Sequence, residues 1–580
     1  MKGEGSAAAI FRRFDTPSTH ARSADTLLRY GDFRAAERFY RRAIEGGATA
    51  AAARIGLGNA LHAGGRRAEA VAEYEAALRL DPEALAARAN LAALLLELGR
   101  PEEAAEHCRA ALARQPGNAV LHHRLGRALL RVDAVDEAKD CLRRAVRLAP
   151  GSASAHNDLG LALVQSLDFT AAASCFRTAL RLRPDFVAAA ANLGGTIAKT
   201  GKWSAAAGAR RAALQRNPRN APEYHNLATM LRDAGRLDAA EQAARAAIRL
   251  VDDYAEAHVG LAMTLLLAGR FEEGWAEYEW RWRLPKAARR MARFHQPRWD
   301  GSPLGDKILL LHAEQGFGDT LQFCRYAPLI AAEGRVVLQV QGELHFLLAG
   351  LPKVERVVGA GEALPRFDLH CPLLSLPHVL GTTLETIPDK TPYLAAAPGR
   401  VAAWRRRLDP IPGVKVGLVC EGSPTMTADR GRSLSLDRLA PLAGLSGVSF
   451  VSLQKGEAAG QTPPPGMVLH DWTGELADFS ETAALIEALD LVIGVDTAVV
   501  HLAGALGKPV WLLNRFDRCW RWLEGRDDSP WYPSLRQLRQ TSPGDWGSVL
   551  VRVRRALEQI AAEQDARSDL LRSLWRFATA

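Results

Sequence analysis

The chain has 580 residues, a formal net charge of +9 and a hydrophobic share of 48%. That apolar share excludes a largely disordered chain, and the length is sufficient for several hydrophobic cores. Arginines are interspersed with Glu and Ala and do not form basic runs with aromatics, so the charge does not predict nucleic-acid binding. There is no stretch of about 18 apolar residues, and we expect no membrane span.

The cysteines and the N-terminus indicate the compartment. Seven cysteines are scattered without a C-x-x-C pair or a metal-ligand spacing, so we expect neither a disulfide framework nor a metal site. Free thiols are typical of a reducing compartment, which predicts a cytoplasmic protein. Residues 1–15 lack the apolar core of a signal peptide and are expected to be a loose leader.

Three series of residues recur every 34 positions through residues 16–283. They are small residues, turn-forming positions and prolines. The small residues are Ala36, Ala70, Ala104, Ala138, Ala172, Ala206, Ala240 and Gly274; the turns are Gly31, Gly65, Gly99, Asp133, Leu167, Gly201, Gly235 and Gly269; the prolines are Pro82, Pro116, Pro150, Pro184 and Pro218. The series suit two touching helices, a turn between them and a stop after the second. They resemble tetratricopeptide repeats and predict an all-α solenoid of eight units.

The eighth repeat differs from the others. Its second helix carries Trp275, Tyr278, Trp280 and Trp282. A terminal repeat must bury its outer face, and aromatic side chains suit docking onto another domain. We therefore expect this repeat to contact the domain that follows.

The remaining sequence predicts an α/β region. After a linker at 284–304, short apolar runs such as KILLLHA, RVVLQVQ and ERVVG alternate with helical segments. A second alternation contains VKVGLVCEG, VSFVSLQKG, DLVIGVD and KPVWLLN. The pattern predicts Rossmann-like lobes at 305–398 and 413–547, a connector at 399–412, and a C-terminal helix and tail at 548–580. A ligand is expected where the carboxyl ends of the two parallel sheets face each other.

Two strand-to-helix turns carry candidate ligand-binding groups. Gly316 and Gly318 follow the first strand and would let a ligand approach the backbone, with Asp319 beside them as a carboxylate or as a helix cap. Asp496, Thr497 and His501 follow DLVIGV. A carboxylate, a hydroxyl and an imidazole there suit a ribose and a pyrophosphate; a capped helix with a core histidine is the alternative.

Two further loops follow predicted strands and carry basic residues. One runs from Gly422 through Ser423 to Arg432, and the other contains Lys455. Basic groups at the ends of strands can meet phosphate, although exposed Arg and Lys are commonly only solvated.

The segments EQGFGDTLQFCRYAPL, SLQKG, DTAVVHLAGALGKPVW and DSPWYP resemble a bacterial group in which tetratricopeptide repeats precede a heptosyltransferase-like domain. That domain has the two-lobed GT-B fold. The layout is also similar to that of protein O-linked N-acetylglucosamine transferases. The resemblance covers residues from about 20 to 560.

The resemblance implies an inverting glycosyltransferase that uses a nucleotide-sugar and needs no metal or cofactor. Asp319 matches the general base that removes the proton of the acceptor hydroxyl. The residues that match the donor site, or lie in its loops, are Gly316, Gly318, Ser423, Arg432, Lys455, Asp496, Thr497 and His501. The acceptor would be a protein or a glycan.

Two alternatives remain open. Cys420 and Glu421 stand where the group usually has a Trp and a small residue. An acid beside a phosphate site is unfavourable, which favours a repeat scaffold carrying an inactive transferase-like domain. The other alternative is carbohydrate assembly without a protein acceptor.

One position of the first helix carries polar residues in several repeats. They are Asn90, Asp158, Asn192 and Asn226. The layout of protein glycosyltransferases implies that such side chains hold a protein or peptide backbone. An ordinary repeat consensus is the alternative.

Overall fold

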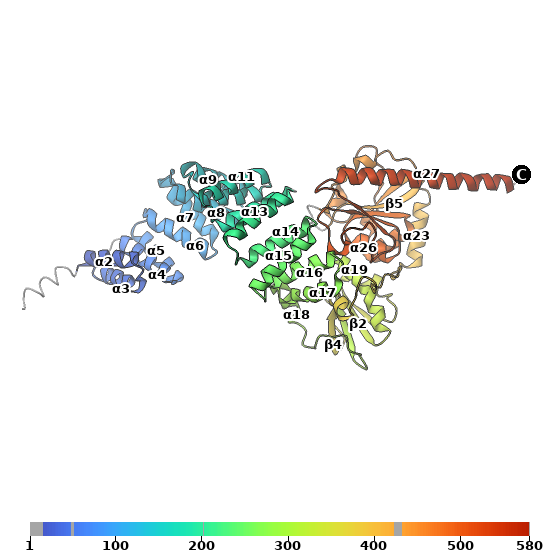
Figure 1. Ribbon diagram of the computed structural model, residues 1–580, viewed down its shortest axis with the longest axis horizontal. Coiled ribbons are helices and arrows are strands. Elements are labelled where there is room, and N and C mark those ends of the chain that lie inside the picture. The colour runs from blue at the N-terminus through green and yellow to red at the C-terminus, as the bar shows by residue number, and fades with distance from the viewer. Residues whose placement is uncertain (1–15, 48–50, 201, 423–431, 579–580) are drawn as a thin grey trace, which may run out of the picture. The chain divides into compact units, whose positions relative to one another are not determined.

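The computed structural model describes residues 16–47, 51–200, 202–422 and 432–578. These residues form two compact units, Met1–Pro218 and Arg219–Ala580 (Figure 1). The boundary lies inside the repeats, because the last two helix pairs belong to the second unit.

The first unit consists of consecutive antiparallel helix pairs. Its helices are α2 (Pro17–Arg29), α3 (Phe33–Glu45), α4 (Ala51–Ala63), α5 (Arg67–Leu80), α6 (Leu85–Glu97), α7 (Pro101–Arg114), α8 (Ala119–Arg131), α9 (Val135–Leu148), α10 (Ala153–Gln165), α11 (Phe169–Leu182), α12 (Val187–Lys199) and α13 (Trp203–Arg216). This arrangement confirms the predicted solenoid.

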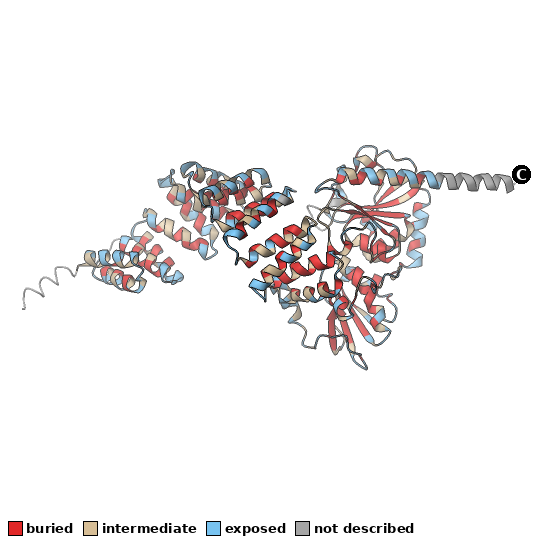
Figure 2. Cartoon of the chain, in the orientation of Figure 1, coloured by how far each residue is buried: buried red, intermediate tan, exposed pale blue. Residues whose placement is uncertain are grey.

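The recurring residues explain the helix pairs. The alanines of the small series, from Ala36 to Ala240, are all 0% exposed, so a larger side chain there would separate the two helices of a pair. A bulky residue of the second helix fills the space above a glycine of the first; Phe176, for example, lies so near Gly160 that an added Cβ would be 2.6 Å from its ring. Buried residues accordingly line the interior of every pair (Figure 2).

The second unit begins with two repeats. These are the helices α14 (Ala221–Asp233), α15 (Leu237–Leu250), α16 (Ala255–Leu267) and α17 (Phe271–Tyr278), followed by the 3-10 helix η1 (Glu279–Arg283). The predicted linker contains a short helix, α18 (Pro285–Met291).

The first lobe is a parallel sheet with the strand order β3-β2-β1-β4. Its strands are β1 (Ile308–His312), β2 (Arg335–Val340), β3 (Arg356–Gly359) and β4 (Leu369–Pro372). The helices and 3-10 segments between them are α19 (Phe317–Phe323), η2 (Cys324–Tyr326), α20 (Ala327–Ala331), η3 (Gly342–Leu344), α21 (His345–Leu348), η4 (Leu373–Ser375) and α22 (Leu376–Val379).

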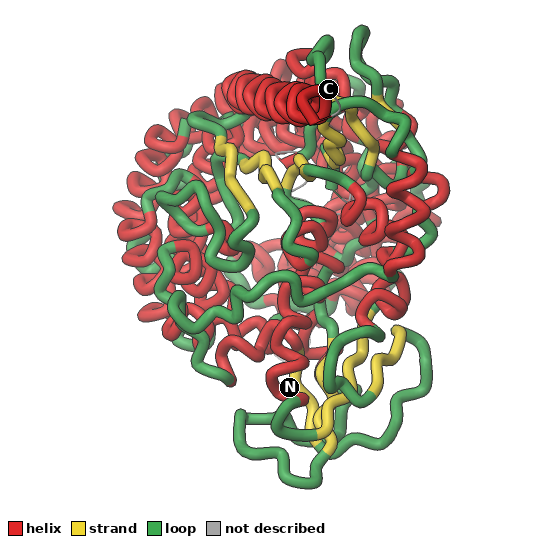
Figure 3. The backbone as a smooth tube through the Cα atoms, turned by 90° about the vertical axis from the view of Figure 1, so that its right-hand side faces the viewer, coloured by secondary structure: helices red, strands yellow, loops and turns green. Residues whose placement is uncertain are grey.

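The second lobe is a parallel sheet with the order β10-β9-β8-β5-β6-β7. The strands of the two lobes form two separate groups (Figure 3). Helix α23 (Pro398–Leu408) lies in the predicted connector. The other elements are β5 (Val414–Val419), η5 (Leu436–Leu442), β6 (Val448–Ser452), η6 (Glu457–Gly460), β7 (Leu469–His470), η7 (Thr473–Glu475), α25 (Phe479–Ala488), β8 (Leu491–Val495), α26 (Ala498–Ala505), β9 (Val510–Asn514), η8 (Trp520–Trp522), β10 (Leu535–Arg539) and α27 (Trp546–Ala578). The predicted α/β class with two sheets is confirmed.

Candidate active site

The loop after β1 carries the first group of candidate residues. Gly316 is the N-cap of α19, and its backbone N–H donates to Asp319 Oδ2 at 3.0 Å. The side chain of Asp319 is 17% exposed. Asp319 therefore acts as a helix-capping group and also presents part of its carboxylate at the surface of the lobe.

Asp319 forms an ion pair with a residue that sequence reasoning missed. Arg521, in η8 of the second lobe, donates to Asp319 Oδ1 and places its Nε 3.0 Å from Gln322 Oε1. Its side chain is 11% exposed. Burial lowers the pKa of Arg521, but the charge of Asp319 and smaller contributions from Cys519 and Tyr278 together outweigh burial, and the net shift is upward. In the sequence Arg521 stands between two tryptophans, and no motif there marks it as a functional residue.

The turn after β8 brings Asp496 to His501. Asp496 Oδ1 lies 3.7 Å from His501 Nε2, and their side chains are 21% and 5% exposed. His501 Nδ1 is 3.0 Å from the Tyr532 hydroxyl, and the ring stacks on Trp522. Burial raises the pKa of Asp496, but the hydrogen bond and charge of His501 lower it more, to about 2. Asp496 is therefore a carboxylate at neutral pH.

Polar groups surround the N-terminus of α26. Thr497 is its N-cap, and the buried hydroxyl of Thr497 has no hydrogen-bond partner among the described residues. Arg432 Nη1 donates to the carbonyl of Asp496 at 2.7 Å. Because free backbone N–H groups and an unpartnered hydroxyl lie together here, this end of α26 suits an anionic oxygen.

The two lobes meet where these turns lie. A Cβ on Gly318 would be 2.8 Å from His501 Cδ2 and 3.6 Å from Ala498 Cα. Phe317 also packs on Phe479, with ring centroids 5.1 Å apart. The structure thus brings Gly316, Gly318 and Asp319 of the first lobe beside the His501 turn of the second. Glycine at 318 is required by the close approach of α19 and α26.

Other predicted donor residues are placed differently. Lys455 Nζ donates to the carbonyls of Thr473 and Leu476, at 2.9 and 2.8 Å, so it holds a loop of its own lobe. Ser423 lies outside the described residues. The Glu421 carboxylate accepts from the amide of Gln461, beside a cavity of about 20 Å³ at the ends of β5 and β6. The donor-binding role of Lys455 stays a prediction.

The predicted groove residues bond mainly to other repeats. Asn90 Nδ2 donates to Asn59 at 2.8 Å, and Asn192 Nδ2 donates to Asn157 at 3.0 Å. Asp158 lies 2.7 Å from His123 Nε2 and is also paired within its helix. Asn226 is exposed. The amides of Asn90 and Asn192 therefore hold neighbouring helices together, and a peptide-binding role for the four residues stays a prediction.

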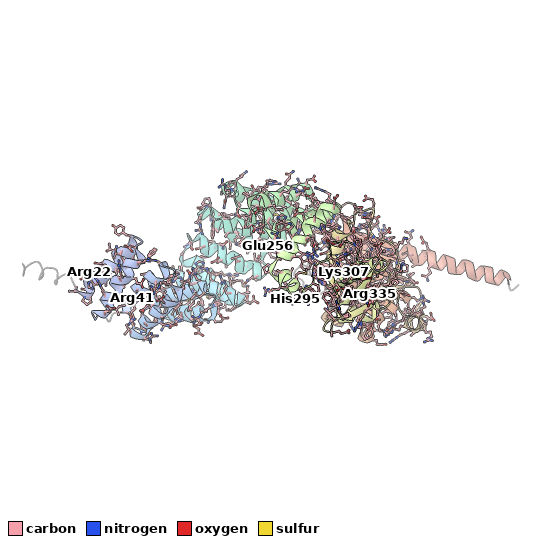
Figure 4. The ribbon with its side chains drawn as sticks, turned by 90° about the horizontal axis from the view of Figure 1, so that it is seen from below. Arg22, Arg41, Glu256, His295, Lys307 and Arg335 are labelled. Atoms are coloured by element: carbon pink, nitrogen blue, oxygen red, sulfur yellow. The ribbon has the colours of Figure 1, made fainter. Side chains whose placement is uncertain are left out.

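A basic cavity lies in the first unit, where the sequence gave no signal. Its volume is about 290 Å³, and it is lined by Ala93, Leu96, Glu97, Arg124, Arg127 and Arg131. Arg124 donates to the carbonyl of Ala89 at 2.6 Å, and burial lowers its pKa. Arg127 and Arg131 are exposed, as are Arg22 and Arg41 on the first repeat (Figure 4).

Metal-binding clusters and membrane-spanning helices are absent from the described residues. Their His, Cys, Asp and Glu side chains form no group of three or more that could hold a metal ion. Each of their helices is too short or too polar to cross a membrane.

Comparison with protein families agrees with the two-part architecture. Tetratricopeptide repeat families match residues 22–74, 63–119, 95–159, 157–221 and 225–279. Glycosyltransferase family 9 (heptosyltransferase) matches residues 474–513, which contain α25, β8, α26 and most of β9. The chain thus carries tetratricopeptide repeats followed by a family 9 segment.

Individual proteins are similar to parts of the chain. Protein FlbA of Caulobacter vibrioides (strain ATCC 19089 / CIP 103742 / CB 15) is 34% identical over 322 residues, 50% of this chain and 53% of that protein. The chain therefore spans about half the length of this curated relative. MamA (41-end) from Desulfovibrio magneticus RS-1 is 23% identical and covers 30% of this chain and 97% of its own, with a TM-score of 0.28. YrrB is 21% identical and covers 32% of this chain and 95% of its own, with a TM-score of 0.28.

Proposed function

We propose that this repeat protein with a heptosyltransferase-like segment is a glycosyltransferase that moves a sugar from a nucleotide-sugar to a hydroxyl of a protein or glycan. The observation that carries the proposal is the meeting of α19 and α26. It places Gly318, the residue before the partly exposed Asp319, against Ala498 at the start of α26. The Thr497 hydroxyl at that helix end has no hydrogen-bond partner among the described residues. The family 9 match covers that same α26 turn.

The geometry supports a direct displacement at the sugar. The acceptor oxygen forms a bond to the anomeric carbon, and the bond from that carbon to the diphosphate breaks. The bonding electrons leave with the nucleoside diphosphate, whose negative charge the α26 N-terminus, Thr497 and Arg432 would stabilise. Asp319 takes the acceptor proton; each of its oxygens accepts one hydrogen bond, so lone pairs remain for this step.

A second candidate function is a scaffold with an inactive domain. The observation that favours it is the Asp319–Arg521 ion pair, because the guanidinium occupies one oxygen of the carboxylate that would take the acceptor proton. The commitment of Lys455 to two carbonyls of its own lobe points the same way. Turnover separates the two functions.

Donor binding is tested by calorimetry with nucleoside diphosphates chosen from a thermal-shift screen of common nucleotide-sugars. We expect Asp496→Ala to weaken binding at least about tenfold, or about 1.4 kcal/mol, because it removes the carboxylate that fixes His501 at the donor turn. Asp409→Ala, at an exposed position after α23, is the matched control and should bind as the wild type does. Equal affinity in the two variants would remove this turn from the site.

We further propose that the repeats of the first unit bind an acidic segment of the acceptor. The basic cavity of the first unit presents the exposed guanidinium groups of Arg131 and of Arg127, whose Nε lies 3.6 Å from Asp158, and these suit carboxylates. Its lining also includes Ala93, Leu96 and the acidic Glu97. Aromatic residues that would stack on nucleic-acid bases are absent from the lining of this cavity in the described part of the chain.

A labelled glutamate-rich peptide tests this proposal by fluorescence anisotropy with the full chain. The double variant Arg127→Gln/Arg131→Gln should weaken binding about fivefold and reduce its salt dependence, since two charge-assisted contacts are lost. Arg177→Gln/Arg181→Gln, with the same spacing on α11, is the matched control. Equal losses in both double variants would indicate a general charge effect and contradict the proposal.

A further inference from the structure

The loop that carries Asp319 is held by the eighth repeat as well as by its own lobe. Tyr278, the last residue of α17, accepts a hydrogen bond from Gln315 Nε2 at 2.9 Å. Gln341 Nε2 donates to the carbonyl of Gln315 at 2.9 Å. Gln315 directly precedes Gly316, so the residue before the cap of α19 is fixed through its side chain and through its backbone.

Glu314, the residue before Gln315, is also held through its side chain and its backbone. Arg281 of η1, which is buried, places Nη2 2.9 Å from Glu314 Oε1. The N–H of Leu374 donates to the same oxygen at 3.2 Å, and Arg290 of α18 donates to the Glu314 carbonyl. Two of these three contacts come from outside the first lobe. The repeat and the short helix after it therefore set the path of the loop into α19.

The eighth repeat also contacts the other partner of the ion pair. Trp275 meets Trp520 edge to face, with ring centroids 5.1 Å apart, and Tyr278 lies 6.4 Å from the same ring. The guanidinium of Arg521 lies 4.3 Å above Trp520. One repeat thus supports both sides of the Asp319–Arg521 pair, which come from different lobes.

We propose that the eighth repeat holds the Asp319 loop in the position needed for sugar transfer. Tyr278 is then a positioning residue that acts on Asp319 through Gln315. This inference rests on the proposed function. The Tyr278 hydroxyl contacts Gln315 of the Asp319 loop, and its ring contacts Trp275, Trp520 and Arg281. Among the described residues, no hydrogen bond or ring contact joins this side chain to Asp496 or Thr497. Loss of its hydroxyl should therefore disturb the base and leave the donor turn intact.

Tyr278→Phe in the full chain tests the inference, because it keeps the ring on Trp520 and removes only the hydroxyl. We expect kcat to fall about fivefold and KM for the donor to stay within about twofold, as for a contact that aligns the reacting groups. Hydrogen exchange of the amides in 314–320 should become about fivefold faster. Tyr254→Phe, in the turn before α16, is the matched control and should change none of these quantities.

Each outcome decides one part of the inference. Unchanged exchange in 314–320 overturns it, whether or not the protein transfers sugar. Faster exchange with unchanged kcat would show that Tyr278 holds the loop but does not position Asp319 for transfer. If the wild-type protein shows no turnover but Tyr278→Phe exchanges faster, the repeat does hold the loop, and the result contradicts the proposed function instead. Should Tyr278→Phe fail to fold, Gln315→Leu breaks the same hydrogen bond from the loop side, and the same three outcomes apply.

Discussion

Sugar transfer by Asp319→Asn is expected to fall by about 10²–10³-fold, with donor affinity within about twofold of the wild type. Asparagine is nearly the same size and can still accept the N–H of Gly316, so the start of α19 should persist. It cannot take the proton of the acceptor hydroxyl. Initial rates with saturating donor, together with calorimetry of donor binding, measure the two quantities separately.

Two comparisons make this result interpretable. Glu333→Gln is the same chemical change at an exposed residue of the first lobe, and should leave transfer unchanged. Transfer by Asp319→Asn at the wild-type rate would exclude Asp319 as the base. If Arg521→Gln instead transfers sugar faster than the wild type, the ion pair restrains the carboxylate. The protein with the ion pair formed would then correspond to the inactive scaffold.

Arg281→Met is expected to lower the free energy of unfolding of the second unit by about 3–5 kcal/mol. The substitution leaves Glu314 buried without the guanidinium that lies 2.9 Å from it, and leaves the half-buried Glu279 with Arg298 as its remaining arginine partner. Urea unfolding followed by tryptophan fluorescence measures the loss. Of the 13 tryptophans only Trp203 precedes Arg219, so the signal reports on the second unit.

The pH dependence of the stability loss and a control variant test whether the loss is electrostatic. Burial raises the pKa of Glu314, and a protonated carboxyl group needs no counter-charge. A carboxyl with a raised pKa in the folded state regains stability as the pH falls, so the deficit of Arg281→Met should shrink toward about pH 5. Arg283→Met, at an exposed position two residues later, should cost under about 1 kcal/mol. A deficit independent of pH would indicate lost packing and contradict the electrostatic explanation.

The solenoid could be predicted because each of its constraints is local. A left-handed residue ends the first helix of a pair, and the series keeps this conformation even where glycine is absent: Asp133 and Leu167 have φ of 60° and 64°. The segment between β5 and β6 contains a 3-10 helix, η5, with Pro441 inside it, and proline disfavours an α-helix there. The strands that the sequence did not reveal, β4, β7 and β10, all lie at sheet edges. β4 and β7 have four and two residues, too few for a periodic pattern, and the five residues of β10, LRQLR, do not form an apolar run.

The candidate site was predictable only where a motif marks a strand-to-helix turn. Gly316, Gly318, Asp319 and the Asp496 turn were found because parallel strands direct such turns to one edge of a sheet. Arg521 was missed because its role depends on a contact with a residue about 200 positions earlier, which no local pattern encodes. The ladder of asparagines between repeats was missed for the same reason, since it pairs residues of different helices.

The boundary at Pro218 has a consequence for how such proteins diversify. Repeats before it can be duplicated, lost or exchanged without changing the internal contacts of the second unit. The two repeats after it cannot, because the eighth one supports the loop of Asp319. Under the proposed function, acceptor recognition by the first unit and sugar transfer by the second can therefore change separately, and the boundary between them falls after the sixth repeat of an array that looks continuous in the sequence.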